Sequence, residues 1–267
     1  MYASWSLLSA PFTRITRVYN REPPPFESSH PREVLTSVMQ TPVLYVILLL
    51  VTVCGQDCPT LNGISPASRQ AIVDKHNAYR SSNALGNEID GSTGQNAPKA
   101  KNMYKLSYDC ELEALAQAWA SGCQFEHSPN YGEVGENIYS DMSPQSNASV
   151  LDALDLWWSE LRNIGVGAYS PDFNNSKALN VRVENYVQMA WANTTKVGCG
   201  NAMCTSPNMY FVVCNYRLPG NMLNEKIYEF GDPCQQDSDC TVTNALCSAS
   251  EGLCYLRGLR SLKLAGI

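Results

Sequence analysis

The sequence is poor in the residues on which many chemistries depend. Only three of its 267 residues are histidines, and only 16% are charged. It contains no Gly-x-Ser-x-Gly motif, the turn that carries the nucleophile of many serine hydrolases. It also lacks a βαβ repeat with a phosphate-binding glycine loop. These absences argue against a serine hydrolase of that type and against a nucleotide-binding enzyme.

A hydrophobic run long enough to cross a membrane is also missing. The longest charge-free apolar run, Val43 to Cys54, has twelve residues, which is too short for a membrane-spanning helix but suits the core of a secretory signal peptide. Met39 lies just before it. We therefore expect residues 1–38 to be a non-native or disordered extension, 39–55 to be a signal peptide, and the secreted protein to begin at Gln56. The alternative is a disordered tail on a membrane-anchored protein.

Positive charge is scarce in the expected secreted part. From Gln56 onward there are 15 Lys and Arg against 22 Asp and Glu, and the basic residues at the end fall in a tail, residues 255–267. A nucleic-acid partner is not expected without a basic face. Three N-x-Ser/Thr sequons, at Asn147, Asn174 and Asn193, predict surface glycosylation in a secreted protein.

Cysteine, by contrast, is abundant. Removal of Cys54 with the signal peptide leaves ten cysteines: Cys58, Cys110, Cys123, Cys199, Cys204, Cys214, Cys234, Cys240, Cys247 and Cys254. An even number in a secreted chain indicates a disulfide framework, but many pairings are open. Four of the ten lie in residues 222–254, a hinge and extension with almost no aliphatic core, which we expect to depend on two internal bridges.

Periodicity predicts helices interleaved with short strands. One helix is expected from Ser65-Pro66 to about Arg80, followed by a loop over 81–99. Further helices are expected after Asp109, from Ser149 to about Gly165, and over 183–192. Strand signals occur at 137–139, 196–199 and 210–216. This order predicts an α+β fold with a sheet packed between helical layers.

Five motifs together resemble the CAP superfamily of cysteine-rich secretory proteins, insect venom allergens and plant pathogenesis-related proteins. They are Gln124-Phe-Glu-His-Ser-Pro129, Gly135-Glu-Asn-Ile138, Trp157-Trp-Ser-Glu160, Glu184-Asn-Tyr-Val-Gln-Met-Ala-Trp191 and Phe211-Val-Val-Cys-Asn-Tyr-Arg-Leu-Pro-Gly-Asn221. The resemblance implies a three-layer α-β-α sandwich over residues 56–221 and a bridge between Cys199 and Cys214. Residues 231–254 look like the C-terminal extension of activation-associated secreted proteins from parasitic roundworms.

The resemblance also implies a cleft with two histidines and two glutamates. His127, Glu136 and Glu160 match three of these positions, but the fourth falls on Asn185. Because an asparagine oxygen is a poor zinc ligand, we expect no cofactor, or at most a weak zinc site on His127, Glu136 and Glu160. We interpret His76, the other histidine after Gln56, as structural.

Two interpretations of this cleft remain open. His127, Glu136 and Glu160 form an acid-base group of a weak hydrolase, or they form a polar network without turnover. The second is favoured, because a buried histidine and two acids need hydrogen-bond partners whether or not they react. All ten cysteines are expected to be paired, and the position of Ser128 directly after His127 is no evidence of a catalytic pair.

Two kinds of partner also remain open. Six aromatic residues are expected to supply most of the core: Trp119, Trp157, Trp158, Trp191, Tyr186 and Phe211. Alternatively, some of them line a groove for a sterol or fatty acid, ligands that several family members bind. Roundworm relatives are released into hosts, where some act on leukocytes, platelets or immune signalling. A protein partner or receptor is then expected to contact the loops Asn83–Asn96 and Tyr169–Asn180. We expect a secreted, non-enzymatic, venom-allergen-like effector that acts on an extracellular host protein.

Overall fold

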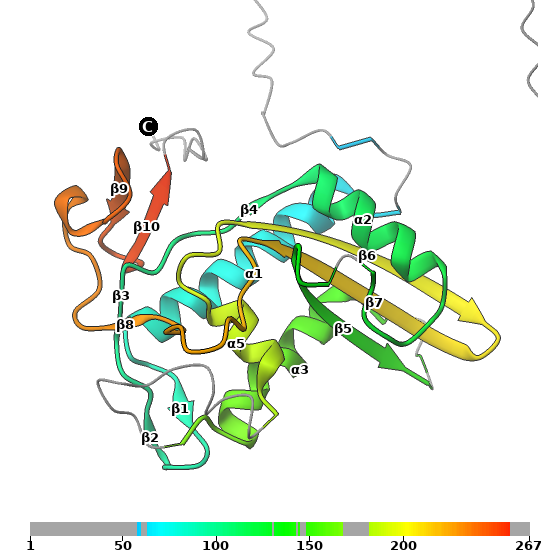
Figure 1. Cartoon of the computed structure of the whole chain (residues 1–267), viewed down its shortest axis with the longest axis horizontal. Coiled ribbons are helices and arrows are strands. Elements are labelled where there is room, and N and C mark those ends of the chain that lie inside the picture. The colour runs from blue at the N-terminus through cyan, green and yellow to red at the C-terminus, as the bar shows by residue number, and fades with distance from the viewer. Residues whose placement is uncertain are drawn as a thin grey trace, which may run out of the picture. The chain divides into compact units, whose positions relative to one another are not determined.

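The computed structural model describes residues 58–59, 63–129, 131–142, 144, 148–167 and 182–256 (Figure 1). The expectations for residues 1–55, for the sequons at Asn147 and Asn174, for the loop Tyr169–Asn180 and for the basic tail after residue 256 lie outside the described residues. None of the described helices has the length and apolar character needed to cross a membrane.

A four-stranded sheet forms the middle of the fold. Its strands are β4 (Ser107–Tyr108), β6 (Lys196–Thr205), β7 (Asn208–Arg217) and β5 (Gly135–Asp141), in that order across the sheet. β4 pairs with β6 in parallel, and the other pairs are antiparallel. β5 and β6 are longer than their sequence signals predicted, because pairing along β7 extends both strands beyond their β-branched residues.

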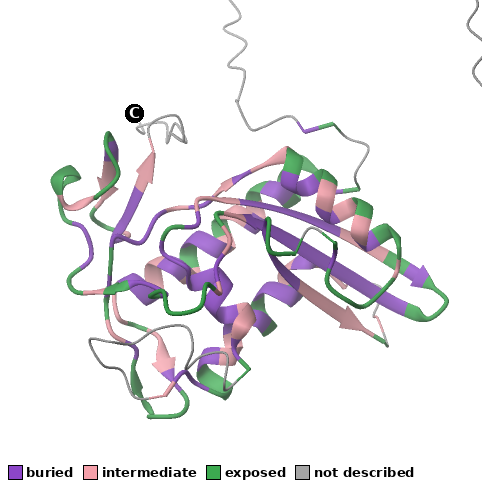
Figure 2. Cartoon of the chain, viewed as in Figure 1, coloured by how far each residue is buried: buried purple, intermediate pink, exposed green. Residues whose placement is uncertain are grey.

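Helices cover both faces of the sheet. α2 (Cys110–Ser121) packs on one face, where Ala116 and Ala120 contact Phe211 and Val213 of β7. α1 (Pro66–Ala84), α3 (Val150–Asn163) and α5 (Glu184–Ala190) lie with the larger core on the other face, which contains Val212 and Cys214. Since successive strand residues point to opposite faces, β7 supplies both cores and is buried almost throughout (Figure 2). The predicted α-β-α sandwich is confirmed.

Two glycines allow α2 to lie close to the sheet. A Cβ atom on Gly198 would come within 2.3 Å of the Glu113 backbone nitrogen, and one on Gly200 would come equally close to that of Gln117. Any larger residue at either position would push the helix away. Trp119, expected in the core, is only partly buried and packs against the smaller core cluster.

The start of the first helix agrees with the sequence prediction, but its end does not. Ser65 caps α1 by accepting a hydrogen bond from the Ser68 backbone, as the Ser-Pro signal predicted. At the other end α1 continues to Ala84, past the predicted end at Arg80. The reason is tertiary: the Asn83 side chain is fully buried and accepts a hydrogen bond from the Tyr186 hydroxyl.

The predicted loop 81–99 therefore contains regular secondary structure. After α1 it forms a short hairpin of β1 (Ile89–Asp90) and β2 (Gln95–Asn96). Asp90 is fully buried and accepts hydrogen bonds from the Ser92 and Val166 backbones. The tip, residues 91–96, is exposed throughout. In the segment Asn83–Asn96, which was expected to contact a protein partner, Asn83, Ala84 and Asp90 are buried, so this tip is its continuous exposed part.

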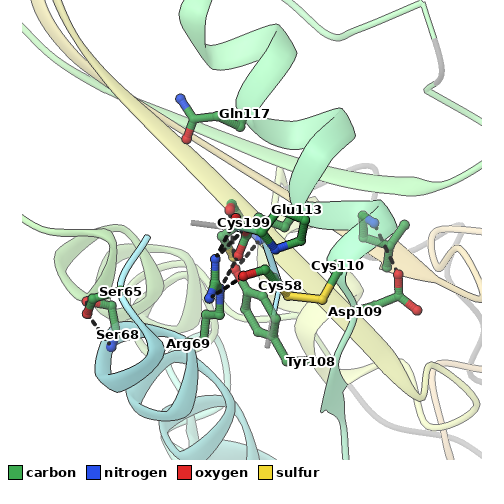
Figure 3. A network of polar contacts seen from close by, with 12 residues as sticks. Cys58, Ser65, Ser68, Arg69, Tyr108, Asp109, Cys110, Glu113, Gln117 and Cys199 are labelled. Atoms are coloured by element: carbon green, nitrogen blue, oxygen red, sulfur yellow. Dashed lines mark hydrogen bonds and ion pairs between the residues drawn. A yellow bond between two sulfur atoms is a disulfide. The ribbon is translucent and has the colours of Figure 1, made fainter. Parts of the chain in front are cut away.

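Two buried arginines tie the layers together. Arg69 of α1 donates two hydrogen bonds, of 2.6 and 2.8 Å, to the buried carboxylate of Glu113 on α2, beside the Cys58–Cys110 bridge (Figure 3). Arg80 donates to five backbone carbonyls, those of Tyr104, Met189, Trp191, Ala192 and Thr194. All five guanidinium N–H groups are thereby satisfied, and α1 is fixed to the segment after α5.

The C-terminal part is bound to the sandwich at several points. β8 (Glu229–Phe230) pairs with β3 (Ala100–Lys101), and Ile227 and Tyr228 are buried in the main core. The hairpin of β9 (Ala245–Ser248) and β10 (Leu253–Leu256), preceded by the short 3-10 helix η2 (Asp237–Asp239), contacts residues 103–105 through backbone hydrogen bonds of Cys254. Within residues 222–254, expected as a hinge and extension, residues 222–226 are exposed, whereas Ile227 and Tyr228 pack in the main core.

Five disulfides involve all ten cysteines from Cys58 onward. They are Cys58–Cys110, Cys123–Cys204, Cys199–Cys214, Cys234–Cys247 and Cys240–Cys254. The third is the pairing that the resemblance implied. The last two are internal to the extension and replace the apolar core that it lacks, since so small a unit buries too little surface to fold alone. Five bridges fit an extracellular location.

Candidate functional site

The first half of the candidate cleft is a pair formed by His127 and Glu136. Glu136 lies at the start of β5 and is almost fully buried, and His127 lies in the loop after α2 with about half of its side chain exposed. The His127 Nδ1 atom is 2.9 Å from Glu136 Oε1, which also accepts a hydrogen bond from the Ser128 backbone. The ring of Tyr131 stacks on His127 at 4.1 Å between centroids. The carboxylate thus orients the imidazole, and Tyr131 covers one of its faces.

The second half is a pair formed by Glu160 of α3 and Asn185 of α5. Asn185 Nδ2 donates to Glu160 Oε1 over 2.7 Å, and the Tyr186 backbone N–H donates to Glu160 Oε2 over 3.0 Å. Both carboxylate oxygens are therefore used at the first turn of α5, where a negative charge is also favoured by the helix dipole. The amide of Asn185 acts here as a donor to the glutamate.

The two pairs lie beside neighbouring residues at the start of the edge strand β5. Glu136 accepts a hydrogen bond from the Ser128 backbone in the loop after α2, and the next residue, Asn137, donates to the Asn185 backbone carbonyl over 3.0 Å. Asn137 thus connects the strand to the second pair, a role that could not be predicted from its place in the Gly-Glu-Asn motif.

A metal does not fit this arrangement. Among the described residues, three ligand atoms of His, Cys, Asp or Glu lie within 4.8 Å of one another only at Cys234, Cys240 and Cys254, which are all in disulfides. His127, Glu136 and Glu160 form no such group. The one position that would supply a second imidazole holds an amide whose N–H₂ points at Glu160. The donor set is therefore one imidazole and two carboxylates already engaged in hydrogen bonds, which is poor for zinc.

His76 belongs to neither of the two pairs, His127–Glu136 and Glu160–Asn185. It is fully buried on α1, with Nδ1 2.8 Å from the Ile72 carbonyl and Nε2 3.0 Å from the Tyr216 hydroxyl. The carbonyl can only accept, so Nδ1 carries the proton and Nε2 accepts from Tyr216. Burial lowers the pKa of His76 to about 4, which keeps it neutral. Its interpretation as a structural residue is consistent with all of these contacts.

The electrostatics of the two glutamates differ. Burial alone would raise the pKa of Glu136, but hydrogen bonds from His127 and Ser128 outweigh it and hold the pKa below the ordinary value. Burial raises the pKa of Glu160, and the hydrogen bonds from Asn185 and Tyr186 offset only part of that effect. An ionised carboxylate orienting a histidine is one part of an acid-base catalyst. A cysteine nucleophile is not available among the described residues, because every described cysteine is in a disulfide.

The aromatic residues do not form an open groove. Trp157, Trp158, Trp191, Tyr186 and Phe211 are all exposed by 5% or less and belong to the packed cores. Trp158 stacks on Tyr79, contacts Tyr186 edge to face and donates to Glu88. These side chains are used in the interior, as the larger share of such residues usually is.

Large apolar side chains are exposed instead on the loop after β7. Leu218, Met222 and Leu223 are 58%, 43% and 66% exposed. The loop is held in place by hydrogen bonds from the Gly220 backbone to Gln188, from Thr194 to the Leu218 carbonyl, and from the Asn221 side chain to the Glu184 carbonyl. This surface was not predicted from the sequence, because residues 218–221 were considered only as part of a family motif and Met222 and Leu223 lie beyond it.

Known proteins resemble this chain in sequence and in structure. Residues 73–216 match the family described as the cysteine-rich secretory protein family, CAP. An Ancylostoma secreted protein from Ancylostoma caninum is 40% identical over 208 residues, which are 73% of this chain. The match covers only 47% of that relative, so this chain spans about half of its length. Venom allergen 3 from Solenopsis invicta is 36% identical, over 62% of this chain and 74% of the allergen.

Two solved structures are similar over most of their own length. BmVAL-1 is 35% identical and covers 74% of this chain and 98% of its own, with a TM-score of 0.68. NaASP2, solved with Zn²⁺, is 38% identical and covers 74% of this chain and 99% of its own, with a TM-score of 0.64. Sequence motifs, layer order and these similarities agree, and the chain belongs to the CAP family of cysteine-rich secretory proteins, as a member of the venom-allergen-like kind.

Proposed function

We propose that this chain is a secreted, non-catalytic CAP protein that acts by binding an extracellular protein of a host. The observation that carries the proposal is the use of the cleft carboxylates within the protein itself. Both Glu160 oxygens accept hydrogen bonds from α5, and Glu136 is bound by His127 and Ser128. A cleft whose acids are engaged in this way serves the fold as a polar network.

The surface that supports protein binding is the Leu218–Leu223 loop. Its three exposed apolar side chains are presented by a backbone that neighbouring residues fix, so little conformational entropy is lost when a partner covers them. Exposed apolar groups held in one place are typical of protein interaction sites. The hairpin tip 91–96 is a second exposed segment, and an exchange there should spare Asp90, which is buried.

The test compares two variants of the secreted protein. One carries Leu218→Ser, Met222→Ser and Leu223→Ser, and the other carries His127→Ala and Glu160→Gln. Saturable binding of each labelled protein to leukocytes and to platelets is measured in competition with unlabelled parent protein. We expect the loop variant to bind at least tenfold more weakly and the cleft variant to bind like the parent. Loss of binding in the cleft variant alone, or no saturable binding by the parent, would refute the proposal.

The hydrolase alternative makes a different demand. It requires turnover of an ester or amide substrate that disappears in both His127→Ala and Glu160→Gln. It is disfavoured because every described cysteine is in a disulfide and because His127 Nδ1 is engaged by Glu136.

A further inference from the structure

The four cysteines of the C-terminal extension lie close enough to exchange partners. Cys234–Cys247 and Cys240–Cys254 are separate bridges, yet the sulfur atoms of Cys234, Cys240 and Cys254 all lie within 4.8 Å of one another. Three of the four sulfurs of two different bridges therefore form one cluster. A thiolate released from one bridge would find the sulfur atoms of the other bridge beside it.

The fourth sulfur completes a second possible pairing. Cys247 on β9 and Cys254 on β10 are directly opposite each other in the hairpin register. The same relation holds between Cys199 and Cys214, which are directly opposite on β6 and β7 and do form a bridge in this protein. A cross-strand bridge between Cys247 and Cys254 is thus compatible with the hairpin backbone, and Cys234 and Cys240 are then left near each other.

We propose that these four cysteines form a thiol-disulfide exchange site, at which a small external thiol of the glutathione class converts the pairing Cys234–Cys247 and Cys240–Cys254 into Cys234–Cys240 and Cys247–Cys254. The external thiol enters at Cys247, which like Cys240 is only partly buried, whereas Cys234 and Cys254 are exposed by 2% and 0%. Exchange at this site follows access as well as thiolate reactivity.

The steps balance without any oxidant. The external thiolate attacks the Cys247 sulfur, forms a mixed disulfide with it and releases Cys234 as a thiolate. Cys234 attacks the Cys240 sulfur, so that a Cys234–Cys240 bond forms and Cys254 leaves as a thiolate. Cys254 attacks the Cys247 sulfur of the mixed disulfide, forms the cross-strand bridge and releases the external thiol. Two disulfides are present before and after, and the thiol is regenerated.

The exchange changes one surface and leaves the docking of the extension intact. The backbone N–H of Cys254 donates to the Met103 carbonyl, and its carbonyl accepts from Lys105, so the attachment of β10 does not depend on its sulfur. Residues 235–239 change instead: their segment is cross-linked to β9 and β10 in one pairing and closed on itself in the other. This segment is exposed and contains Asp237 and Asp239.

The first experiment maps the bridges of the oxidised, secreted protein after incubation with reduced glutathione over a range of concentrations. Acid quenching and alkylation with N-ethylmaleimide precede digestion without reduction. Cleavage at Asp237 or Asp239, at Leu246 and at Glu251 separates the four cysteines, so each pairing gives its own peptides. We expect both pairings, in a ratio that stops changing with time, while the fully buried Cys199–Cys214 bridge stays closed.

Two results would overturn the proposal. One is recovery of only the original pairing at every glutathione concentration below that which opens Cys199–Cys214. The other is recovery of Cys234–Cys254 with Cys240–Cys247 as the exchanged form.

A pair of double variants gives an independent measurement. Cys234→Ser with Cys240→Ser leaves Cys247 and Cys254, which should close into a bridge, so that the folded monomer has no alkylatable thiol. Cys240→Ser with Cys254→Ser keeps the original Cys234–Cys247 bridge and is the matched control. Two free thiols in the first variant, with none in the control, would show that the cross-strand geometry is unsuitable.

Discussion

The burial of His76 predicts a loss of stability in mild acid that can be assigned to one side chain. The folded protein holds this imidazole neutral, with Nδ1–H donating to the Ile72 carbonyl and Nε2 accepting from the Tyr216 hydroxyl. Protonation would put a second proton on the ring, break the bond from Tyr216 and leave a charge in the core. Burial therefore lowers the pKa of His76 from 6.5 to about 4.

The sign and size of the effect follow from linkage. Between pH 6.5 and 4 the unfolded chain binds a proton at His76 that the folded chain does not bind, so the free energy of unfolding falls as the pH falls through this window. A difference of two to three pKa units corresponds to about 3 kcal/mol. That is a large part of the stability of an ordinary domain.

The assay is urea unfolding at pH 4, 5, 6 and 7 with disulfides intact, followed by tryptophan fluorescence. His76→Gln cannot take up the proton, so we expect it to be less stable than the parent by about 1–2 kcal/mol at pH 7, to match the parent near pH 5, and to be more stable than the parent by about 1–2 kcal/mol near pH 4. Tyr216→Phe keeps the imidazole and should keep the pH dependence. A constant difference between parent and His76→Gln over the whole pH range would refute the reasoning, because ionisable groups common to both proteins cancel in that difference.

Three further predictions follow from the buried polar contacts and the packed aromatic core. Arg80→Met should reduce the free energy of unfolding by about 3–6 kcal/mol, because the buried carbonyls of Tyr104, Met189 and Thr194 lose the donor that the structure shows for them; a loss below about 1 kcal/mol in urea unfolding would contradict this. Asn185→His should bind zinc at least tenfold more tightly than the parent in calorimetric titration, and adding His127→Ala should abolish the gain, whereas equal affinities would contradict our account of the cleft. Titration of the parent with a labelled sterol and a labelled fatty acid, each competed by unlabelled ligand, should give no saturable binding, because the aromatic residues expected to line a groove are packed in the core; saturable binding of either would restore the lipid alternative.

Much of the fold could be predicted because its signals are local. The Ser65-Pro66 start of α1, the capping of α2 by Asp109 and the wide apolar stripe of α3 all depend on residues within a turn or two of one another. The family motifs then placed these elements in layers. The end of α1 could not be predicted, since Asn83 is kept helical by a contact with Tyr186, a hundred residues later in the chain.

The candidate site shows the same division. The sequence alone established which residue types stand at the four cleft positions, and above all that Asn185 replaces an imidazole. It could not show that the Asn185 amide is bound to Glu160, that Glu113 is an ion-pair partner of Arg69, or that Arg80 satisfies five carbonyls, because each of these contacts joins segments far apart in the chain.

Composition and local pattern thus predicted a disulfide-bonded protein with a sheet between helical layers, since helix caps and strand alternation are properties of short segments, and the resemblance of its motifs to the CAP family implied the α-β-α sandwich. Only the tertiary structure decided which polar groups are hydrogen-bonded in the interior and which apolar side chains remain exposed. Burial and hydrogen-bond pairing depend on what the rest of the chain brings against a residue. For that reason three features became visible only in the folded molecule: the hydrogen-bonded carboxylates of Glu136 and Glu160, the exposed Leu218–Leu223 loop, and the cluster of sulfur atoms in the extension.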